Sequence, residues 1–319
     1  MWKNSPRGKA LSKERGFVLH RNDRGIPPDR EITLIETELR MREGYPKVSI
    51  IIPTSDGYRN GLFPALLRQL SEQSFQDFET IIIKGDSRQG RAINTGADIA
   101  RGGYLLTLDD DTRLGSEDAI ETLYRILEEH GSIGMAGGIN VIPPGATPFV
   151  RRVMREVPRR STPPVNEITD SDLAEHPLLI MRKDVFTKVG GENELIPRGL
   201  DPYLRREFRK AGYRVVVVPG VRYSHLPPHT LSSLIKQFYR NGRLAAFCNK
   251  FYPQWVFETP DTHGSGFVVQ RPFSYRAARY LVNMVKRAFK GHLIYLTVSL
   301  AYAVGFTRGY VCYKDETQT

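Results

Sequence analysis

The chain has 319 residues, of which 40% are hydrophobic and 25% charged, enough for one large α/β domain with an appendage or for two modest domains. The formal net charge of +11 suits an anionic partner such as a nucleotide or a phospholipid surface. Cys248 and Cys312 form no disulfide framework and no metal-type spacing, so we expect a reducing cytoplasmic setting. We expect no signal peptide in residues 1–30 and no membrane-spanning helix, because no apolar run reaches about 18 residues.

The first 45 residues are basic and interrupted by Gly and Pro, and we expect them to lie outside the main core. Within them Ile32, Ile35 and Leu39 recur at helical spacing, which predicts an amphipathic helix over residues 31–42. Next in the chain we expect strands over 47–54, 78–83 and 104–108, separated by helices over 62–73 and 91–100. This alternation predicts a parallel sheet with right-handed crossovers.

Further along, the pattern predicts a helix over 116–130, a strand over 134–141, a short strand over 178–181 and a helical turn over 184–189. A helix over 201–211, a strand over 213–218 and a helix over 231–247 follow. The stretch 143–176 is predicted to be an irregular functional loop. It carries a cluster of arginines, namely Arg151, Arg152, Arg155, Arg159 and Arg160.

The apolar run 104–108 ends in three consecutive carboxylates, Asp109, Asp110 and Asp111. Ligands of open α/β sheets bind outside the carboxyl ends of the strands, where this triplet is expected to lie. A Mg²⁺ or Mn²⁺ ion holding a phosphate would relieve the repulsion among the three charges. The alternative is a solvated acidic turn in which Asp111 or Thr112 caps the next helix, and the residues alone leave both interpretations open.

Several motifs in matching order resemble the family-2 glycosyltransferases over roughly residues 46–245. The matching segments are residues 48–54, 78–83, 90–96, 100–104 with the acidic triplet, 185–191 and 199–205. The resemblance is to inverting enzymes of bacterial and archaeal polysaccharide type. It implies the GT-A fold, a Rossmann-like α/β architecture with a mostly parallel sheet flanked by helices. We then expect a basic extension at 1–45, a catalytic domain at 46–225 and a C-terminal helical region at 226–319.

The resemblance also implies roles for individual residues. Asp109 and Asp111 match the two acids of the D-x-D element, with His225 as a further metal contact, and Asp110 is expected as a spacer turned away from the cation. Asp201 matches the general base that deprotonates the acceptor. The residues expected around the donor are Pro53, Thr54, Asp86, Arg91, Asn94, Asp109, Asp110, Arg240 and Arg243. The implied cofactor is Mn²⁺ or Mg²⁺.

Two positions depart from the family pattern. The acid expected directly after the second strand is displaced to Asp86, which leaves the nucleotide base open, and Leu200 stands where the family has the Glu of a Glu-Asp pair. Asp201 could therefore act as a helix cap, with Pro202 at the first helical position, as well as a base. Arg91, Asn94 and His225 each have an alternative structural interpretation as ordinary helix-face or packing residues.

In the C-terminal third, the residue pattern beyond Phe273 predicts a basic amphipathic helix. On a helical wheel, basic residues occupy about one third of the circumference and apolar residues the rest. The bases are Arg276, Arg279, Lys286, Arg287 and Lys290. An apolar run at 293–306 follows, and it suits either core packing or a membrane surface. We expect a cytoplasmic protein, peripheral at the inner face of the cell membrane.

The leading hypothesis is thus a hexosyltransferase-like glycosyltransferase that uses a nucleotide-sugar donor. A UDP-sugar is the first expectation, and a GDP- or dTDP-sugar is the alternative. Its acceptor would be a glycan or a lipid-linked glycan, as in polysaccharide biosynthesis. A sugar-phosphate nucleotidyltransferase is the second hypothesis, but the segment 54–58 lacks the Gly-rich basic loop that a triphosphate needs. A non-catalytic protein that binds polyanions or membranes is the third. Nucleic acid is not an expected partner, because the carboxylates would repel its phosphates.

Overall fold

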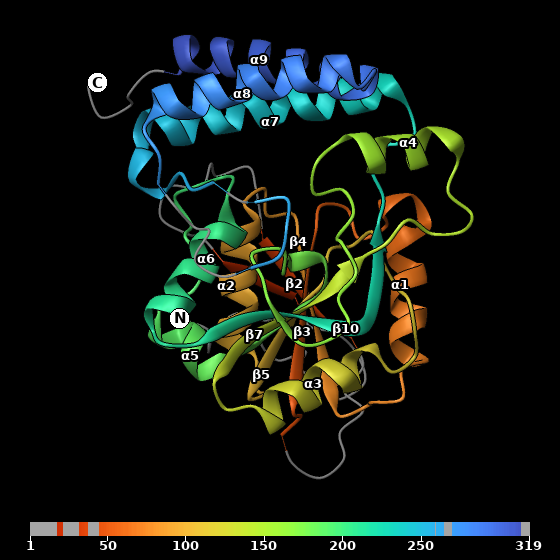
Figure 1. The fold of residues 1–319 in the computed structure, drawn as a ribbon. Helices are drawn as coiled ribbons and strands as arrows, with labels where there is room; N and C mark the ends of the chain where they lie inside the picture. The colour runs from red at the N-terminus through yellow and green to blue at the C-terminus, as the bar shows by residue number, and fades with distance from the viewer. Residues whose placement is uncertain (1–17, 22–31, 38–44, 259, 265–269, 314–319) are drawn as a thin grey trace.

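Ten strands form one mixed sheet at the centre of this computed structural model, which describes residues 18–21, 32–37, 45–258, 260–264 and 270–313 (Figure 1). The strand order is β1-β2-β4-β3-β5-β9-β7-β10-β6, with β8 paired to β10. The strands are β1 (Val18–Arg21), β2 (Ile32–Thr37), β3 (Val48–Thr54), β4 (Phe78–Lys84), β5 (Tyr104–Thr107), β6 (Thr112–Leu114), β7 (Ile133–Asn140), β8 (Thr169–Asp170), β9 (Leu179–Arg182) and β10 (Arg214–His225). The helices are α1 (Leu62–Ser71), α2 (Gln89–Ile99), α3 (Ala119–Glu129), α4 (Pro148–Glu156), α5 (Lys183–Lys188), α6 (Leu200–Lys210), α7 (Leu231–Phe251), α8 (Phe273–Phe289) and α9 (Leu293–Cys312).

The α/β architecture predicted from the sequence is confirmed, with a parallel core in which β3 lies between β4 and β5. These strands are apolar nearly throughout because helices cover both of their faces. A second parallel pair, β7 and β10, joins the core through β9, which runs antiparallel to both β5 and β7. The carboxyl ends of β3, β5, β7 and β10 therefore meet at one edge of the sheet.

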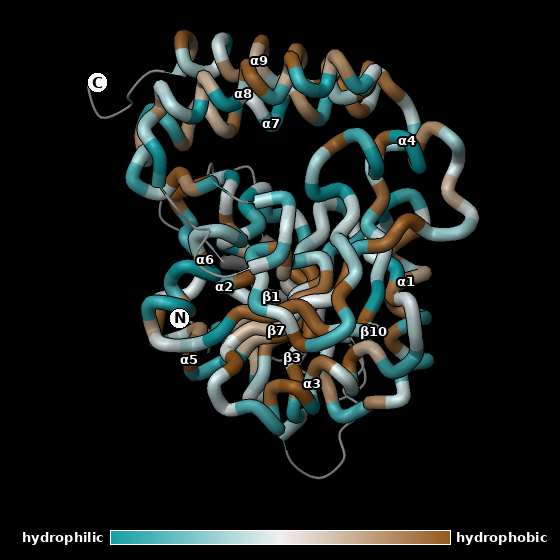
Figure 2. Tube along the Cα trace, viewed as in Figure 1, coloured by the Kyte–Doolittle hydropathy of each residue, from teal (hydrophilic) through white to brown (hydrophobic). Residues whose placement is uncertain are grey.

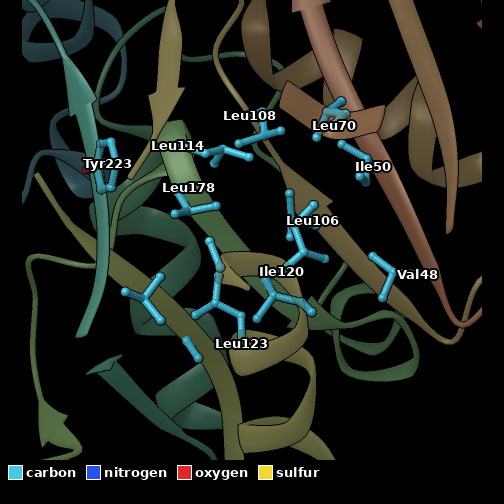
Figure 3. Close-up of a cluster of buried hydrophobic side chains, with 14 of the residues drawn as sticks. Val48, Ile50, Leu70, Leu106, Leu108, Leu114, Ile120, Leu123, Leu178 and Tyr223 are labelled. Atoms are coloured by element: carbon cyan, nitrogen blue, oxygen red, sulfur yellow. The ribbon is translucent and has the colours of Figure 1, made fainter. Parts of the chain in front are cut away.

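Side chains on alternate positions of β3 enter two separate cores. Ile51 packs under α2, α5 and α6, together with Ile93 and Phe208. Ile50 and Ile52 point to the opposite face, where α1 and α3 cover them. Figure 3 shows the second core, in which Ile50 and Leu106 lie close to side chains of α1 and α3. This period-two alternation keeps the register of the central strands fixed, since a slip by one residue would exchange the two cores.

The predicted helix over residues 31–42 is wrong in the part that the structure describes. Ile32–Thr37 forms β2, which pairs antiparallel with β4 and joins the main sheet. Ile32, Thr33 and Ile35 are β-branched, which favours an extended backbone, and the edge of β4 offers free pairing groups. The rest of the predicted helix, residues 38–42, lies outside the described residues.

The prediction of an irregular stretch over 143–176 is also wrong in part, because α4 begins within it. The Thr147 side chain accepts a hydrogen bond from the Val150 N–H at 3.2 Å, and Pro148 occupies the first turn. Both features are typical of a helix start. Three of the clustered arginines thus belong to a helix, while Arg159 and Arg160 follow it.

Three long helices, α7, α8 and α9, form a layer over the edge of the sheet at which the parallel strands end (Figure 1). The backbones of α7 and α9 approach closely at three glycines, Gly242, Gly305 and Gly309. A Cβ at Gly242 would lie 2.1 Å from the Tyr302 carbonyl oxygen, so no larger residue fits there. Among the helices that the structure describes, none combines the length and hydrophobicity needed to span a bilayer.

Candidate active site

The acidic triplet lies directly after β5, at the edge where the parallel strands end. Thr112 begins β6, which pairs antiparallel with β10 so that His225 lies opposite Thr112. This register brings the His225 side chain beside the triplet. The Asn140 amide oxygen, at the end of β7, accepts a hydrogen bond from the His225 N–H at 3.1 Å. Three strand ends therefore fix the position of one imidazole.

Asp109, Asp111 and His225 offer one ligand atom each, and these atoms lie within 4.8 Å of one another. His225 Nε2 lies 3.0 Å from Asp111 Oδ1 and 3.8 Å from Asp109 Oδ2. Asp111 Oδ1 is buried and forms no hydrogen bond of normal geometry within the described residues. Two carboxylates and an imidazole are donors that Mn²⁺ accepts. The residues present therefore fit a divalent cation, and they are the three that the sequence analysis proposed as ligands.

The pKa values of the cluster are shifted in opposite directions. Burial, reinforced by the charge of Asp111, raises the pKa of Asp109 to about 6. Burial alone would raise the pKa of Asp111 too, but the contact with His225 and the charge of Arg59 lower it to about 2. Burial would lower the pKa of His225, yet the two carboxylates raise it overall. The group thus attracts positive charge strongly, as a cation site must.

Asp110 turns to the neighbouring strand and lies outside this cluster. Its Oδ2 accepts a hydrogen bond from the Thr54 hydroxyl at 2.7 Å. Arg59 binds the next acid of the triplet, because it donates hydrogen bonds to Asp111 Oδ2 from Nε at 3.0 Å and from Nη2 at 2.7 Å. Asp110 therefore ties the end of β3 to the acidic turn.

Arg59 was not foreseen in the sequence, and its backbone explains why. Its φ is 46° and that of Asn60 is 55°, a left-handed conformation that is costly for residues other than glycine. The Asp56 carboxylate stabilises this loop by accepting hydrogen bonds from the N–H groups of Tyr58 and Arg59, at 2.8 and 2.9 Å. The strained loop aims a guanidinium at Asp111, and no periodic pattern signals such a placement.

Asp86 and Arg91, both expected near the donor, bind one another. Arg91 Nε and Nη2 each lie 2.7 Å from an oxygen of Asp86, in a bidentate pair. Asn94 makes three hydrogen bonds to the segment after α5, with the backbone of Glu192 at both N and O and with the Glu194 side chain. Its amide groups hold that segment in place, in line with the structural interpretation of Asn94.

Asp201 lies in the first turn of α6, after the left-handed Gly199. Its Oδ1 accepts a hydrogen bond from the His176 N–H at 2.9 Å. The His176 ring is buried between two acids, with Nε2 2.9 Å from Glu192 Oε1 and 3.9 Å from Asp201 Oδ1. The Asp201 side chain stays partly exposed, so it can meet a ligand.

Charge within this second cluster keeps Asp201 ionised. Burial would raise the pKa of Asp201, but the charges of His176 and Arg205 lower it. Burial would lower the pKa of His176, but Asp201 and Glu192 raise it to about 9. Glu175, which precedes His176, has a raised pKa because of burial and the charge of Asp201. Glu175 therefore lies near enough to Asp201 for the two charges to interact, although Leu200 stands directly before Asp201 in the sequence.

The two arginines proposed for the diphosphate lie on α7. Arg240 is exposed, and the Arg243 guanidinium lies over the Tyr313 ring at 5.5 Å from its centre. Arg160 was not singled out for this role, yet its charge acts on both Asp111 and His225. Arg160 Nη2 also donates to Gln237 Oε1 at 2.7 Å, so it links α7 to the acidic edge.

Residues 34–190 match the family model described as glycosyl transferase family 2. An uncharacterized glycosyltransferase of Haemophilus influenzae is 26% identical over 185 residues, covering 49% of this chain. The match spans 59% of that relative's length. The family-model match includes the acidic triplet.

Among solved structures, a mannosyltransferase from Pyrobaculum calidifontis in complex with GDP-Man and Mn²⁺ has a TM-score of 0.51 at 13% identity. The alignment covers 84% of this chain and 88% of the mannosyltransferase chain. The S. aureus TarS structure of residues 1–349 is also similar, with a TM-score of 0.41 at 12% identity. That alignment covers 84% of this chain and 91% of the TarS chain. The first likeness shows a shared fold, that of the GT-A glycosyltransferases.

Proposed function

The chain belongs to glycosyl transferase family 2, and from this premise we propose that it moves a sugar from a nucleotide-diphosphate sugar to an acceptor hydroxyl, with inversion at the anomeric carbon. The observation that carries the proposal is the convergence of Asp109, Asp111 and His225 at the carboxyl edge of the sheet. In the part of the chain that the structure describes, Asp201 accepts a hydrogen bond from another residue only at Oδ1, which leaves Oδ2 for a ligand.

On the donor side, the end of β3 would form the floor of the nucleotide site. Thr54 is held by Asp110 at 2.7 Å, and the Asp86–Arg91 pair lies at the end of β4 and the start of α2. A divalent cation held by Asp109, Asp111 and His225 would neutralise the charge that develops on the departing diphosphate. Arg160, whose charge acts on Asp111 and His225, and the exposed Arg240 are candidates for further phosphate contacts.

On the acceptor side, Asp201 would take the proton of the attacking hydroxyl. The hydrogen bond from the His176 N–H orients its carboxylate, and the charges of His176 and Arg205 keep that carboxylate ionised. A positioned carboxylate of this kind contributes about 10²- to 10⁴-fold to such a transfer. The base and the diphosphate would stand on opposite sides of the anomeric carbon, which gives inversion.

We propose a UDP-sugar as the first donor to test, with GDP- and dTDP-sugars as alternatives. The mannosyltransferase of similar fold was solved with GDP-Man and Mn²⁺, which keeps a guanine nucleotide among them. The proposed acceptor is a glycan or a lipid-linked glycan, and the proposed setting is the cytoplasm, at the inner face of the membrane.

Calorimetric titration of UDP, GDP and dTDP, with MnCl₂ and with EDTA, tests the donor half of this proposal. One of the three should bind tightly only with Mn²⁺, and Asp111→Asn should remove that dependence. Asp184→Asn is the matched control, because Asp184 is an exposed carboxylate on α5 and its loss should change nothing. Equal binding by the Asp111 variant would refute the cation site, and binding of a nucleoside triphosphate alone would favour a nucleotidyltransferase.

A further inference from the structure

Helix α4 and the turn between α8 and α9 are tied into one corner of the molecule (Figure 1). Glu156, at the end of α4, accepts hydrogen bonds from the N–H groups of Ile294 and Tyr295 at 2.9 and 3.4 Å. These are free donors at the start of α9, so one buried carboxylate caps that helix from α4. Val153 packs against Val298 in the small core beneath. The relative placement of α4 and α9 is thereby fixed.

This corner is strongly basic. Residues 262–314 contain eight Lys and Arg residues and no Asp or Glu. An open hollow of about 760 Å³ lies between α4 and the α8–α9 turn. Its basic lining residues are Arg151, Arg152, Arg155, Lys290 and His292.

One acid, Glu156, also lines the hollow, and it neutralises only one of the basic charges. Only Arg152 has an acidic partner in the described part of the chain, namely Glu156. Arg151 donates to the backbone carbonyl oxygens of Ala146 and Pro144, which carry no net charge. Arg155 and Lys290 are exposed, and their side chains form no hydrogen bond or ion pair with any described residue. The hollow therefore attracts an external anion.

An apolar stripe begins at the same turn. Leu281, Val285 and Phe289 follow one another at a spacing of four residues on α8, and their exposed fractions are 62%, 56% and 89%. Leu293, the first residue of α9, is 62% exposed. No residue of α8 is buried. Figure 2 shows hydrophobic and hydrophilic residues alternating along α8 beside the more apolar α9. A stripe of this size beside unpaired bases indicates a partner surface.

The charge distribution decides between the candidate partners. A second copy of the chain, docked on this face by a two-fold axis, would bring Lys286 and Lys290 against the same bases of its partner. An anionic phospholipid bilayer instead offers phosphates to the bases and an acyl boundary to the apolar stripe. Of these two partners, the bilayer complements both the bases and the apolar stripe.

We propose that the corner formed by α4 and the α8–α9 turn docks on an anionic phospholipid bilayer. Val285, Phe289 and Leu293 enter the boundary between head groups and acyl chains. The hollow lined by Arg155 and Lys290 receives a lipid phosphate. This inference rests on no step of the proposed sugar transfer, and it can be tested on the protein without donor or acceptor.

Co-sedimentation of the full chain with phosphatidylcholine vesicles that contain about 30% phosphatidylglycerol tests the docking. The protein should sediment with these vesicles, hardly at all with pure phosphatidylcholine, and much less at about 1 M NaCl, where the Debye length shrinks to about 3 Å. Lys286→Gln/Lys290→Gln should weaken partitioning about 30-fold. Phe289→Ser should weaken it about tenfold. Failure of the wild-type chain to sediment with anionic vesicles would overturn the proposal.

A matched control removes two exposed bases that do not line the hollow, Arg68 on α1 and Lys188 on α5. Arg68→Gln/Lys188→Gln has the same net charge as the Lys286/Lys290 variant and should keep wild-type binding. If both pairs weaken binding equally, net charge is the cause and the corner is not the site. A dimer in analytical ultracentrifugation that Phe289→Ser dissociates would overturn the lipid assignment in favour of a second copy. Unchanged thermal unfolding of each variant verifies its fold, since all these side chains are exposed.

Discussion

The acidic edge of the sheet and the basic corner at α4 and the α8–α9 turn use charge in opposite ways. At the edge, Asp109, Asp111 and His225 are half-buried and held by neighbours on several strands. At the corner, Arg155 and Lys290 are exposed and have no partner in the described residues. The first arrangement fixes a few atoms, as reaction chemistry requires. The second needs only a high density of charge, because a lipid surface carries many equivalent phosphates.

Asp201 provides the largest expected effect. Asp201→Asn should lower turnover about 10³-fold while nucleotide binding stays within about twofold, because the amide cannot accept the proton. Glu175→Gln, a change of the neighbouring buried acid, should lower turnover by less than tenfold. Initial rates and calorimetric affinities for both variants check this. A larger loss in Glu175→Gln would transfer the role of base to Glu175.

The glycines between α7 and α9 provide the largest effect on stability. A Cβ at Gly305 would lie 2.1 Å from the Tyr239 carbonyl oxygen, so Gly305→Val should reduce the free energy of unfolding by about 3 kcal/mol. Val304→Ala, at the exposed neighbouring position, should change it by less than about 1 kcal/mol. Urea denaturation measures both values. Similar values for the two variants would mean that the helices are not packed this closely.

His176 should make stability depend on pH. Its pKa is raised to about 9 in the folded protein by Asp201 and Glu192, against the opposing effect of burial. The stabilisation is fully present below the unfolded pKa of about 6.5 and is lost as the pH rises through about 9. The free energy of unfolding should therefore fall by about 3 kcal/mol between these pH values. His176→Gln should flatten that slope, and a slope kept by this variant would exclude His176 as its source.

Arg59 provides the smallest expected effect. Its side chain is 48% exposed although it contacts Asp110 and Asp111. Solvent screens such pairs, so Arg59→Ala should change the free energy of unfolding by less than about 1 kcal/mol. Urea denaturation at neutral pH measures the change. A loss of several kcal/mol would show that the acidic edge depends on this arginine for its fold.

The two regions also differ in how well the sequence predicted them. Asp109 and Asp111 come after β5, and His225 is the last residue of β10, so strand ends that meet at one edge bring together the three residues that the family resemblance implied. The α8 helix was predicted from its periodicity in the same way. In contrast, Arg59 depends on a left-handed loop, and the His176–Glu192 pair joins segments that approach only in the folded chain. Local patterns cannot show such contacts. The helix expected at 31–42 failed because an unpaired edge of β4 decided the conformation of β2.

The cation site is the central claim, and anomalous diffraction at the manganese edge tests it most directly. Crystals would be grown with MnCl₂ and the nucleoside diphosphate selected by titration. The expected result is a single anomalous peak that is coordinated by Asp109, Asp111 and His225 and in contact with the diphosphate. A bound nucleotide with no manganese beside these residues, or with the ion held elsewhere, would contradict the account.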